Sequence, residues 1–123
     1  MKRVLVVDDE PMVIYSVRRI LESAKIDVYT ADSGQACLEE LRKGFKGLIL
    51  MDIMMPGMDG WDTIDEIVKE GFAEGNIICM LTGKEEPDEK MEKLKEYVLD
   101  YIRKPFDKDQ LLAIVGDYLA YLE

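Results

Sequence analysis

Histidine is absent from the 123 residues of the chain, and this absence excludes several kinds of chemistry. Without an imidazole the chain cannot use Ser-His-Asp or Cys-His catalysis, form a histidine metal site, or act as a histidine phosphocarrier. Any chemistry must therefore use carboxylates, lysine and hydroxyl groups.

Cysteine occurs only twice, at Cys37 and Cys79, and the two residues lack the spacing of metal or redox motifs. Both lie in apolar stretches of sequence, where a free cysteine is usually a buried core residue. We expect two reduced core thiols and no disulfide.

Long hydrophobic runs are also missing. Only four apolar residues separate the positive start MKR from Asp8, too few for a signal peptide, and runs such as LILM are too short to cross a bilayer. The 16 basic residues are outnumbered by 26 acidic ones, and the net charge of -10 opposes unaided binding to nucleic acid or anionic lipid. We expect a soluble cytoplasmic protein with no nucleic-acid or membrane partner.

What the sequence does contain is an alternation of apolar, β-branched runs with segments of helical period. Its length and 48% hydrophobic content suit one domain with a proper core. The strand runs are RVLVVD, IDVYT, KGLILMD, NIICML and YVLDYI. This alternation predicts an α/β fold, a doubly wound five-stranded parallel sheet with helices on both faces. The first, third and fourth runs are apolar throughout and suit central strands, so the other two are expected nearer the edges.

Helical periodicity separates the strand runs. Apolar residues recur at helical spacing at Val13, Val17, Ile20, Leu21 and Ala24, and again at Leu111, Leu112, Val115, Leu119 and Leu122. Ser33 and Asp107 stand where helix N-caps are expected, and Gly44 marks a helix end. Residues 84–96 are highly charged, so we expect the loosest helix there.

Polar side chains stand at the ends of four of the strand runs. Asp8 and Asp9 end the first, Asp52 the third, Thr82 the fourth and Lys104 the fifth. In an open parallel sheet, ligands bind outside the carboxyl ends of the strands, where the strand order reverses. The sequence therefore predicts that three carboxylates, one hydroxyl and one ammonium converge on one edge of the sheet.

Adjacent carboxylates repel one another unless a cation lies among them. Mg²⁺ is the natural candidate, because it prefers oxygen ligands and is commonly held by one or two carboxylates together with phosphate oxygens. Lys104 then has a reason to lie nearby, as the counter-charge of a phosphoryl group.

The segments VLVVDDEP, LILMDIMMPGMDGWD, MLTG and DYIRKPF, in this order and spacing, resemble the receiver domain of two-component response regulators. The resemblance covers essentially the whole chain. It implies that Asp52 accepts a phosphoryl group from the phosphohistidine of a sensor histidine kinase. It also implies that Mg²⁺ is held by Asp9, Asp52 and the backbone carbonyl of Met54, with Asp8 helping through the metal's water molecules.

The same resemblance implies roles for residues on the last two strands. Lys104 would pair with the phosphoryl oxygens, and a cis peptide between Lys104 and Pro105 would aim it into the site. Thr82 would swing its hydroxyl onto the phosphoryl group, and Tyr101 would be the coupled aromatic switch.

The lifetime of the phosphoryl group would depend on the side chains two positions beyond Asp52 and Thr82, which are Met54 and Lys84. Hydrolysis needs a water molecule in line with the phosphorus. Methionine can neither accept a proton nor orient that water, and lysine can hold the phosphoryl oxygens. We therefore expect slow self-dephosphorylation.

Only enough sequence for one helix follows Lys104 and Pro105, so we expect a single receiver domain over residues 1–123 with no output domain. Such a chain is not an enzyme, apart from catalysing its own phosphorylation and dephosphorylation. It would act by docking onto a downstream target or a phosphotransfer protein. A stand-alone chemotaxis-type regulator, a phosphorelay intermediate and a phosphate sink all remain open.

Other readings of these residues also remain open. A small phosphatase with an aspartate nucleophile after its first strand would carry Asp-x-Asp, where this chain has Asp8 and then Glu10. A non-phosphorylated pseudo-receiver that serves as a binding module would be expected to lose Asp9, Asp52 or Lys104, and all three are present. Taken alone, DDEP could also be a solvated helix start with Asp9 as its cap.

The sequence departs from the usual receiver pattern at two places. Tyr97 and Val98 stand where the family usually has Gly-Ala before the fifth strand, and Gly83 stands where a small alanine usually follows the switch hydroxyl. The first departure leaves open how the fourth helix meets the fifth strand.

Overall fold

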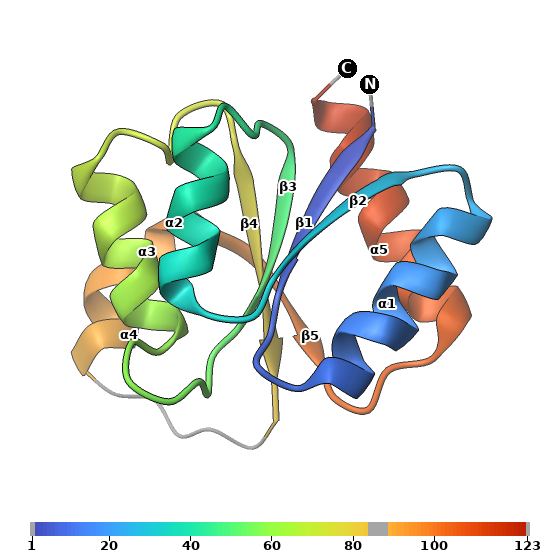
Figure 1. Ribbon diagram of the computed structural model, residues 1–123, viewed down its shortest axis with the longest axis horizontal. Helices are drawn as coiled ribbons and strands as arrows, with labels where there is room; N and C mark the ends of the chain where they lie inside the picture. The colour runs from blue at the N-terminus through green and yellow to red at the C-terminus, as the bar shows by residue number, and fades with distance from the viewer. Residues whose placement is uncertain (1, 84–88, 123) are drawn as a thin grey trace.

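The computed structural model describes residues 2–83 and 89–122, in which strands and helices alternate along the chain (Figure 1). The strands are β1 (Arg3–Val7), β2 (Asp27–Ala31), β3 (Leu48–Asp52), β4 (Ile77–Thr82) and β5 (Val98–Arg103). The α-helices are α1 (Pro11–Ser23), α2 (Gly34–Arg42), α3 (Gly60–Lys69), α4 (Glu89–Leu94) and α5 (Lys108–Tyr121), and a 3₁₀ turn spans Lys95–Tyr97.

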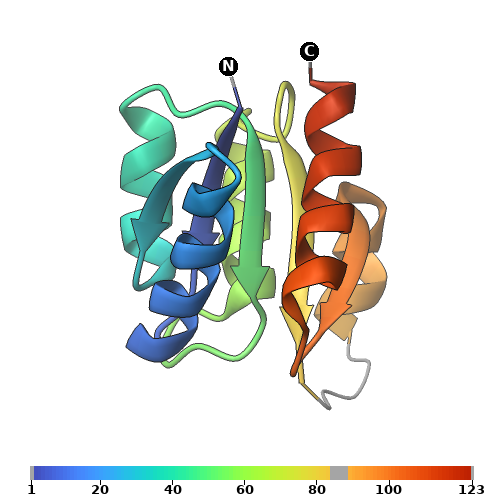
Figure 2. The ribbon, with the colours of Figure 1, turned by 90° about the vertical axis from the view of Figure 1, so that its right-hand side faces the viewer.

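The five strands form one parallel sheet in the order β2-β1-β3-β4-β5. Helices α1 and α5 cover one face, and α2, α3 and α4 cover the other (Figure 1). Figure 2 looks onto α1 and α5, with the sheet behind them. The predicted doubly wound fold is confirmed, and so is the placement of β2 and β5 at the edges. The strand order reverses between β1 and β3, where such sheets bind ligands.

The core has two parts, because successive side chains of the central strands point to opposite faces of the sheet. Side chains of β3 alternate between them, with Ile49 and Met51 on the side of α2 and α3, and Leu48 and Leu50 on the side of α1 and α5. Every residue of β3 is buried.

Cys37 and Cys79 lie one in each part of the core, and both are free thiols. Burial raises the pKa of each thiol to about 12, so neither is readily ionised. Two reduced, buried thiols are what the sequence predicted.

Both helix caps that the sequence predicted are confirmed. The Ser33 side chain caps α2 by accepting the Ala36 N–H, and Asp107 caps α5. Helix α1 differs: Pro11 is its first residue and Glu10 occupies the cap position without a side-chain cap bond, so Asp9 is not the cap. Proline suits the first helical position because its missing N–H is not needed there.

No helix within the described ranges is both long and apolar enough to cross a bilayer.

The junction of α4 and β5 accommodates the unusual Tyr97-Val98 pair. Helix α4 gives way to the 3₁₀ turn that contains Tyr97, whose partly buried side chain packs on the α2–α3 side of the core. Val98 pairs with Ile78, but Cys79 pairs with Asp100, so the register shifts by one residue and Leu99 is left exposed. The bulge lies directly after the Tyr97-Val98 pair, at an edge of the sheet, where bulges are common.

Candidate functional site

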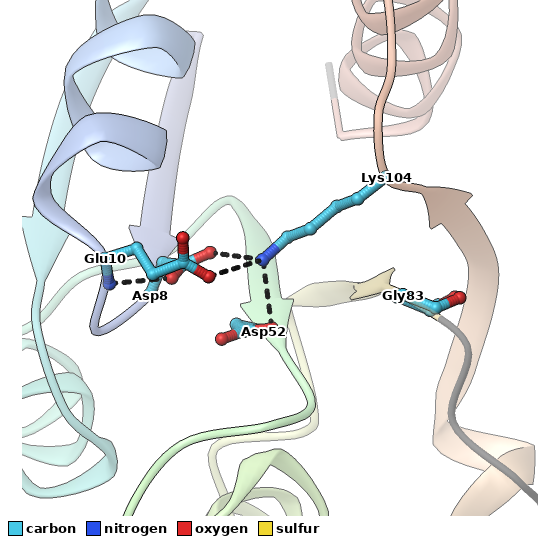
Figure 3. A network of polar contacts seen from close by, with 6 residues as sticks. Asp8, Glu10, Asp52, Gly83 and Lys104 are labelled. Carbon is cyan, nitrogen blue, oxygen red and sulfur yellow. Dashed lines mark hydrogen bonds and ion pairs between the residues drawn. The ribbon is translucent and has the colours of Figure 1, made fainter.

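The carboxyl ends of β1, β3 and β5 bring Asp8, Asp52 and Lys104 together (Figure 3). Lys104 Nζ donates to Asp8 Oδ2 at 2.9 Å and to Asp52 Oδ1 at 3.2 Å. Both carboxylates are buried, whereas the Lys104 side chain is about one-fifth exposed, at 21%. The Lys104 ammonium, at the end of β5, therefore links β1 and β3, neither of which is paired with β5 in the sheet.

Asp9 completes a cluster of carboxylates with Asp8 and Asp52. One carboxylate oxygen from each lies within 4.8 Å of the others. Burial, followed by the charge of Asp8, raises the pKa of Asp52 from 3.8 to about 6, although Lys104 opposes the shift. Burial disfavours the charged form of Lys104, but its hydrogen bond to Asp8 and the nearby carboxylates raise its pKa above the ordinary value.

The chemistry of this donor set fits a hard divalent cation such as Mg²⁺. It consists of three carboxylates, which are the oxygen ligands that Mg²⁺ prefers. A single ammonium does not balance three negative charges. Both oxygens of Asp8 already accept hydrogen bonds, from Lys104 and from the Glu10 N–H at 2.9 Å, which leaves Asp9 and Asp52 better placed for direct contact with an ion.

The position of Asp52 is fixed by the close approach of α3 to the end of β3. The Gly60 N–H donates to the Ile53 carbonyl at 2.8 Å, and a Cβ at Gly60 would lie 2.5 Å from the Asp52 carbonyl oxygen. Only glycine permits this approach. The turn into α3 is closed by a capping box, in which Asp59 accepts the Asp62 N–H and Asp62 accepts the Asp59 N–H.

Thr82 lies at the end of β4, where its hydroxyl donates to the Gly83 carbonyl at 3.2 Å. Its own carbonyl accepts the Lys104 N–H at 2.6 Å, which ties the ends of β4 and β5 together. The peptide between Lys104 and Pro105 is cis. Lys84, which the sequence singled out for phosphoryl lifetime, lies outside the described residues.

Tyr101 and Met54 are the remaining residues that the sequence singled out, and both are exposed. The Tyr101 side chain is 40% exposed on β5, and its pKa is raised chiefly by burial. Met54 follows Asp52 by two positions and is 66% exposed. Neither belongs to the hydrogen-bonded group around Lys104 described above.

Sequence reasoning missed two residues of this site. Glu10 Oε1 lies 4.0 Å from Lys104 Nζ, and Gly60 supplies the close approach to Asp52. A signal for Gly60 was present in the motif MDG, because a glycine after an aspartate cap is unusual inside an amphipathic helix and indicates close backbone packing. Glu10 gave no such signal.

A family model for the response regulator receiver domain matches residues 4–116. A CheY-like response regulator receiver domain protein from Methanospirillum hungatei has a similar solved structure, with a TM-score of 0.94 and 46% identity over 98% of this chain and 96% of that one. Chemotaxis protein CheY4 of Vibrio cholerae has a TM-score of 0.83 and 28% identity, covering 97% of this chain and 99% of that one.

Two relatives differ in how much of their length the chain covers. Protein PilH of Pseudomonas aeruginosa is 29% identical over 120 residues, covering 98% of this chain and 99% of PilH. The probable transcriptional regulator ycf27 of Pyropia yezoensis is 35% identical over 122 residues, covering 96% of this chain and 47% of that protein. The chain thus spans nearly all of one relative and about half of the other.

Proposed function

The chain belongs to the response regulator receiver domain family, and we propose that it is a phosphorylatable signalling receiver whose acceptor is Asp52. The observation that carries this proposal is the approach of Lys104 Nζ to Asp52 Oδ1, 3.2 Å, beside the carboxylates of Asp8 and Asp9. One nucleophile, one cation and an oxygen-rich metal site are the parts that phosphoryl transfer needs.

The transfer would proceed from the phosphohistidine of a sensor histidine kinase. An Asp52 carboxylate oxygen attacks the phosphorus in line, the phosphorus–nitrogen bond breaks, and the kinase imidazole leaves with the electron pair. Asp9, Asp52 and the Met54 carbonyl would hold Mg²⁺, with Asp8 acting through water. When bound, the ion neutralises the charge on the phosphoryl oxygens.

The residues around Asp52 support this role. Because Lys104 already donates to Asp52, its ammonium can follow the transferred group and pair with the new phosphoryl oxygens. Asp8 suits the nucleophile of the alternative phosphatase less well, since it is fully buried and both of its oxygens accept hydrogen bonds.

The signal would pass to partners through Thr82 and Tyr101. The Thr82 hydroxyl, which donates to the Gly83 carbonyl, would turn to the phosphoryl oxygens. Tyr101, exposed on β5, would then change position and alter the surface that docks a downstream protein or a phosphotransfer protein. In this proposal the chain acts as one cytoplasmic receiver domain that catalyses only its own phosphorylation and dephosphorylation.

The deciding experiment is phosphorylation by acetyl phosphate with Mg²⁺, read by intact mass. The wild type should gain one phosphoryl group and Asp52→Asn none. Asp27→Asn is the matched control: it changes an exposed aspartate at the start of β2, outside the carboxylate cluster, and it should still be labelled. Labelling of Asp52→Asn would remove Asp52 as the acceptor, and loss of labelling in Asp8→Asn with phosphate mapped to Asp8 would favour the phosphatase.

A further inference from the structure

Helices α2 and α3 approach one another at Gly34 without room for a side chain. Gly34 is the first residue of α2 and is buried. A Cβ added there would lie 2.3 Å from Thr63 Oγ1 and 2.7 Å from Met58 Sδ. Non-bonded heavy atoms normally stay about 3.5–4.0 Å apart. The backbone of α2 therefore rests directly against the first turn of α3.

Thr63 cannot turn away easily to make room. It is fully buried, and its hydroxyl donates to the Asp59 carbonyl at 2.8 Å. Rotating that hydroxyl would break a hydrogen bond at the cap of α3. Met58 is more flexible, but it belongs to the loop that runs from Asp52 to α3.

The opposite side of this turn is equally tight. Gly60 donates to the Ile53 carbonyl, and a Cβ at Gly60 would lie 2.5 Å from the Asp52 carbonyl oxygen. The first turn of α3 is therefore held between the start of α2 and the end of β3. It has no room to move toward Asp52.

The far ends of the two helices are joined as well. Arg42, the last residue of α2, donates to both carboxylate oxygens of Glu70, the C-cap of α3, at 2.8 and 2.7 Å. This pair is exposed and restrains the far ends only weakly. Crowding at Gly34 would therefore be relieved where it arises, at the near end beside Asp52.

From these contacts we propose that Gly34 is a positioning residue for the site. Its missing side chain fixes the first turn of α3, and with it residues 53–59, relative to Asp52. The expected effect of Gly34 on Mg²⁺ affinity rests on the proposed function, whereas its effect on the position of residues 53–59 does not.

The first test measures the Mg²⁺ affinity of Gly34→Ala by isothermal titration calorimetry. Residues that support metal ligands typically change affinity by about tenfold or more when mutated, and we expect a loss of that order. Gly116→Ala is the matched control, because it lies in α5 and a Cβ there meets nothing within 4 Å. It should leave the affinity unchanged, and an unchanged affinity in Gly34→Ala would overturn the proposal.

A double-mutant cycle separates positioning from general instability. Thr63→Ala removes the nearest atom that the new methyl would meet, and the remaining neighbour, Met58, has a flexible side chain. Gly34→Ala should therefore cost less Mg²⁺ affinity in that background than in the wild type. An equal loss in both backgrounds would show that the contact with Thr63 is not the cause. If Gly34→Ala does not fold, Thr63→Val is used instead. This variant keeps the side-chain volume but loses the hydrogen bond to the Asp59 carbonyl, which holds Thr63 against Gly34. An unchanged Mg²⁺ affinity in Thr63→Val would count against the proposal.

The second readout needs no metal. Amide exchange at Gly60, whose N–H donates to the Ile53 carbonyl, should be about tenfold faster in metal-free Gly34→Ala, while exchange in β1 scales only with global stability. Unchanged protection of Gly60 would overturn the inference. A wild type that neither binds Mg²⁺ nor is phosphorylated would remove the proposed function, and the exchange comparison would still decide the role of Gly34.

Discussion

Lys104 and Asp52 are 52 positions apart in sequence, yet the lysine Nζ lies 3.2 Å from the aspartate Oδ1. The same ammonium donates to Asp8 at 2.9 Å. Without phosphate, the cation of the site is thus engaged by two buried carboxylates. Phosphorylation of Asp52 would not have to recruit a cation, because it would exchange one anionic partner of Lys104 for another.

Replacing Lys104 with methionine should destabilise the metal-free protein by about 3 kcal/mol, since breaking a buried ion pair leaves uncompensated charge. Urea unfolding in EDTA measures this loss, and added Mg²⁺ should restore part of it. Lys69→Met is the control: its ion pair with Asp65 is exposed, and exposed pairs contribute far less to stability than buried ones. An equal loss of unfolding free energy in the two variants would show that the buried ion pair of Lys104 stabilises the protein no more than an exposed one.

Asp9→Asn should weaken Mg²⁺ binding strongly and raise the stability of the metal-free protein. The reason is relief of repulsion within the carboxylate cluster. Asp9 does not occupy the cap position of α1, so loss of a helix cap should not mask the gain. Thermal melts in EDTA provide the measurement, and a metal-free variant less stable than the wild type would contradict this explanation.

The pH dependence of stability in EDTA should reflect the raised pKa of Asp52. Its value in the folded protein is about 6 against an ordinary 3.8, so the folded state binds this proton more tightly than the unfolded state. The contribution to stability is therefore full below about pH 4 and falls as the pH rises through 6, by on the order of 1 kcal/mol per pH unit. Asp52→Asn removes this group.

Urea unfolding of both proteins between pH 4 and 7 gives the comparison. The wild type should lose stability relative to Asp52→Asn as the pH rises across this range. A constant difference between the two would mean that the pKa of Asp52 is not raised in the folded protein.

The aspartyl phosphate should decay slowly, because neither Met54 nor Lys84 is expected to promote attack by water. The decay of phosphorylated Asp52 in Mg²⁺ can be followed by intact mass for the wild type and for Met54→Asn combined with Lys84→Glu. The double variant should decay faster. Decay of the wild type within seconds, or no acceleration in the variant, would refute this role for the two positions.

Much of the fold could be predicted because the strands carry strong local signals. The run LILMD is apolar up to Asp52, and a strand with that pattern must be covered on both faces. The polar residues at the carboxyl ends of β1, β3 and β5 could be placed together because parallel strands end at one edge of the sheet. That argument needs the topology but no side-chain detail.

The parts that could not be predicted depend on how elements pack. The bulge at Leu99 is a feature of the pairing between β4 and β5, which no local pattern encodes. The alternative reading of Asp9 as a helix cap could be rejected only from the structure, in which Pro11 begins α1 and Glu10 takes the cap position. The close contact at Gly34 depends on a residue of another helix, Thr63, and is invisible in the sequence around it.

The complete burial of β3 means that no alternation of polar and apolar side chains fixes its register. Contacts at the start of the strand have to do so. The Gly47 N–H donates to Asn76 Oδ1 at 2.8 Å, the Ile77 N–H donates to the Gly47 carbonyl, and a Cβ at Gly47 would lie 2.4 Å from the Arg3 carbonyl oxygen. Asn76 lies at the opposite end of the sheet from the carboxylates. Through its contact with Gly47 it helps to fix the register of β3 against β4, and this register determines where along the sheet Asp52 lies.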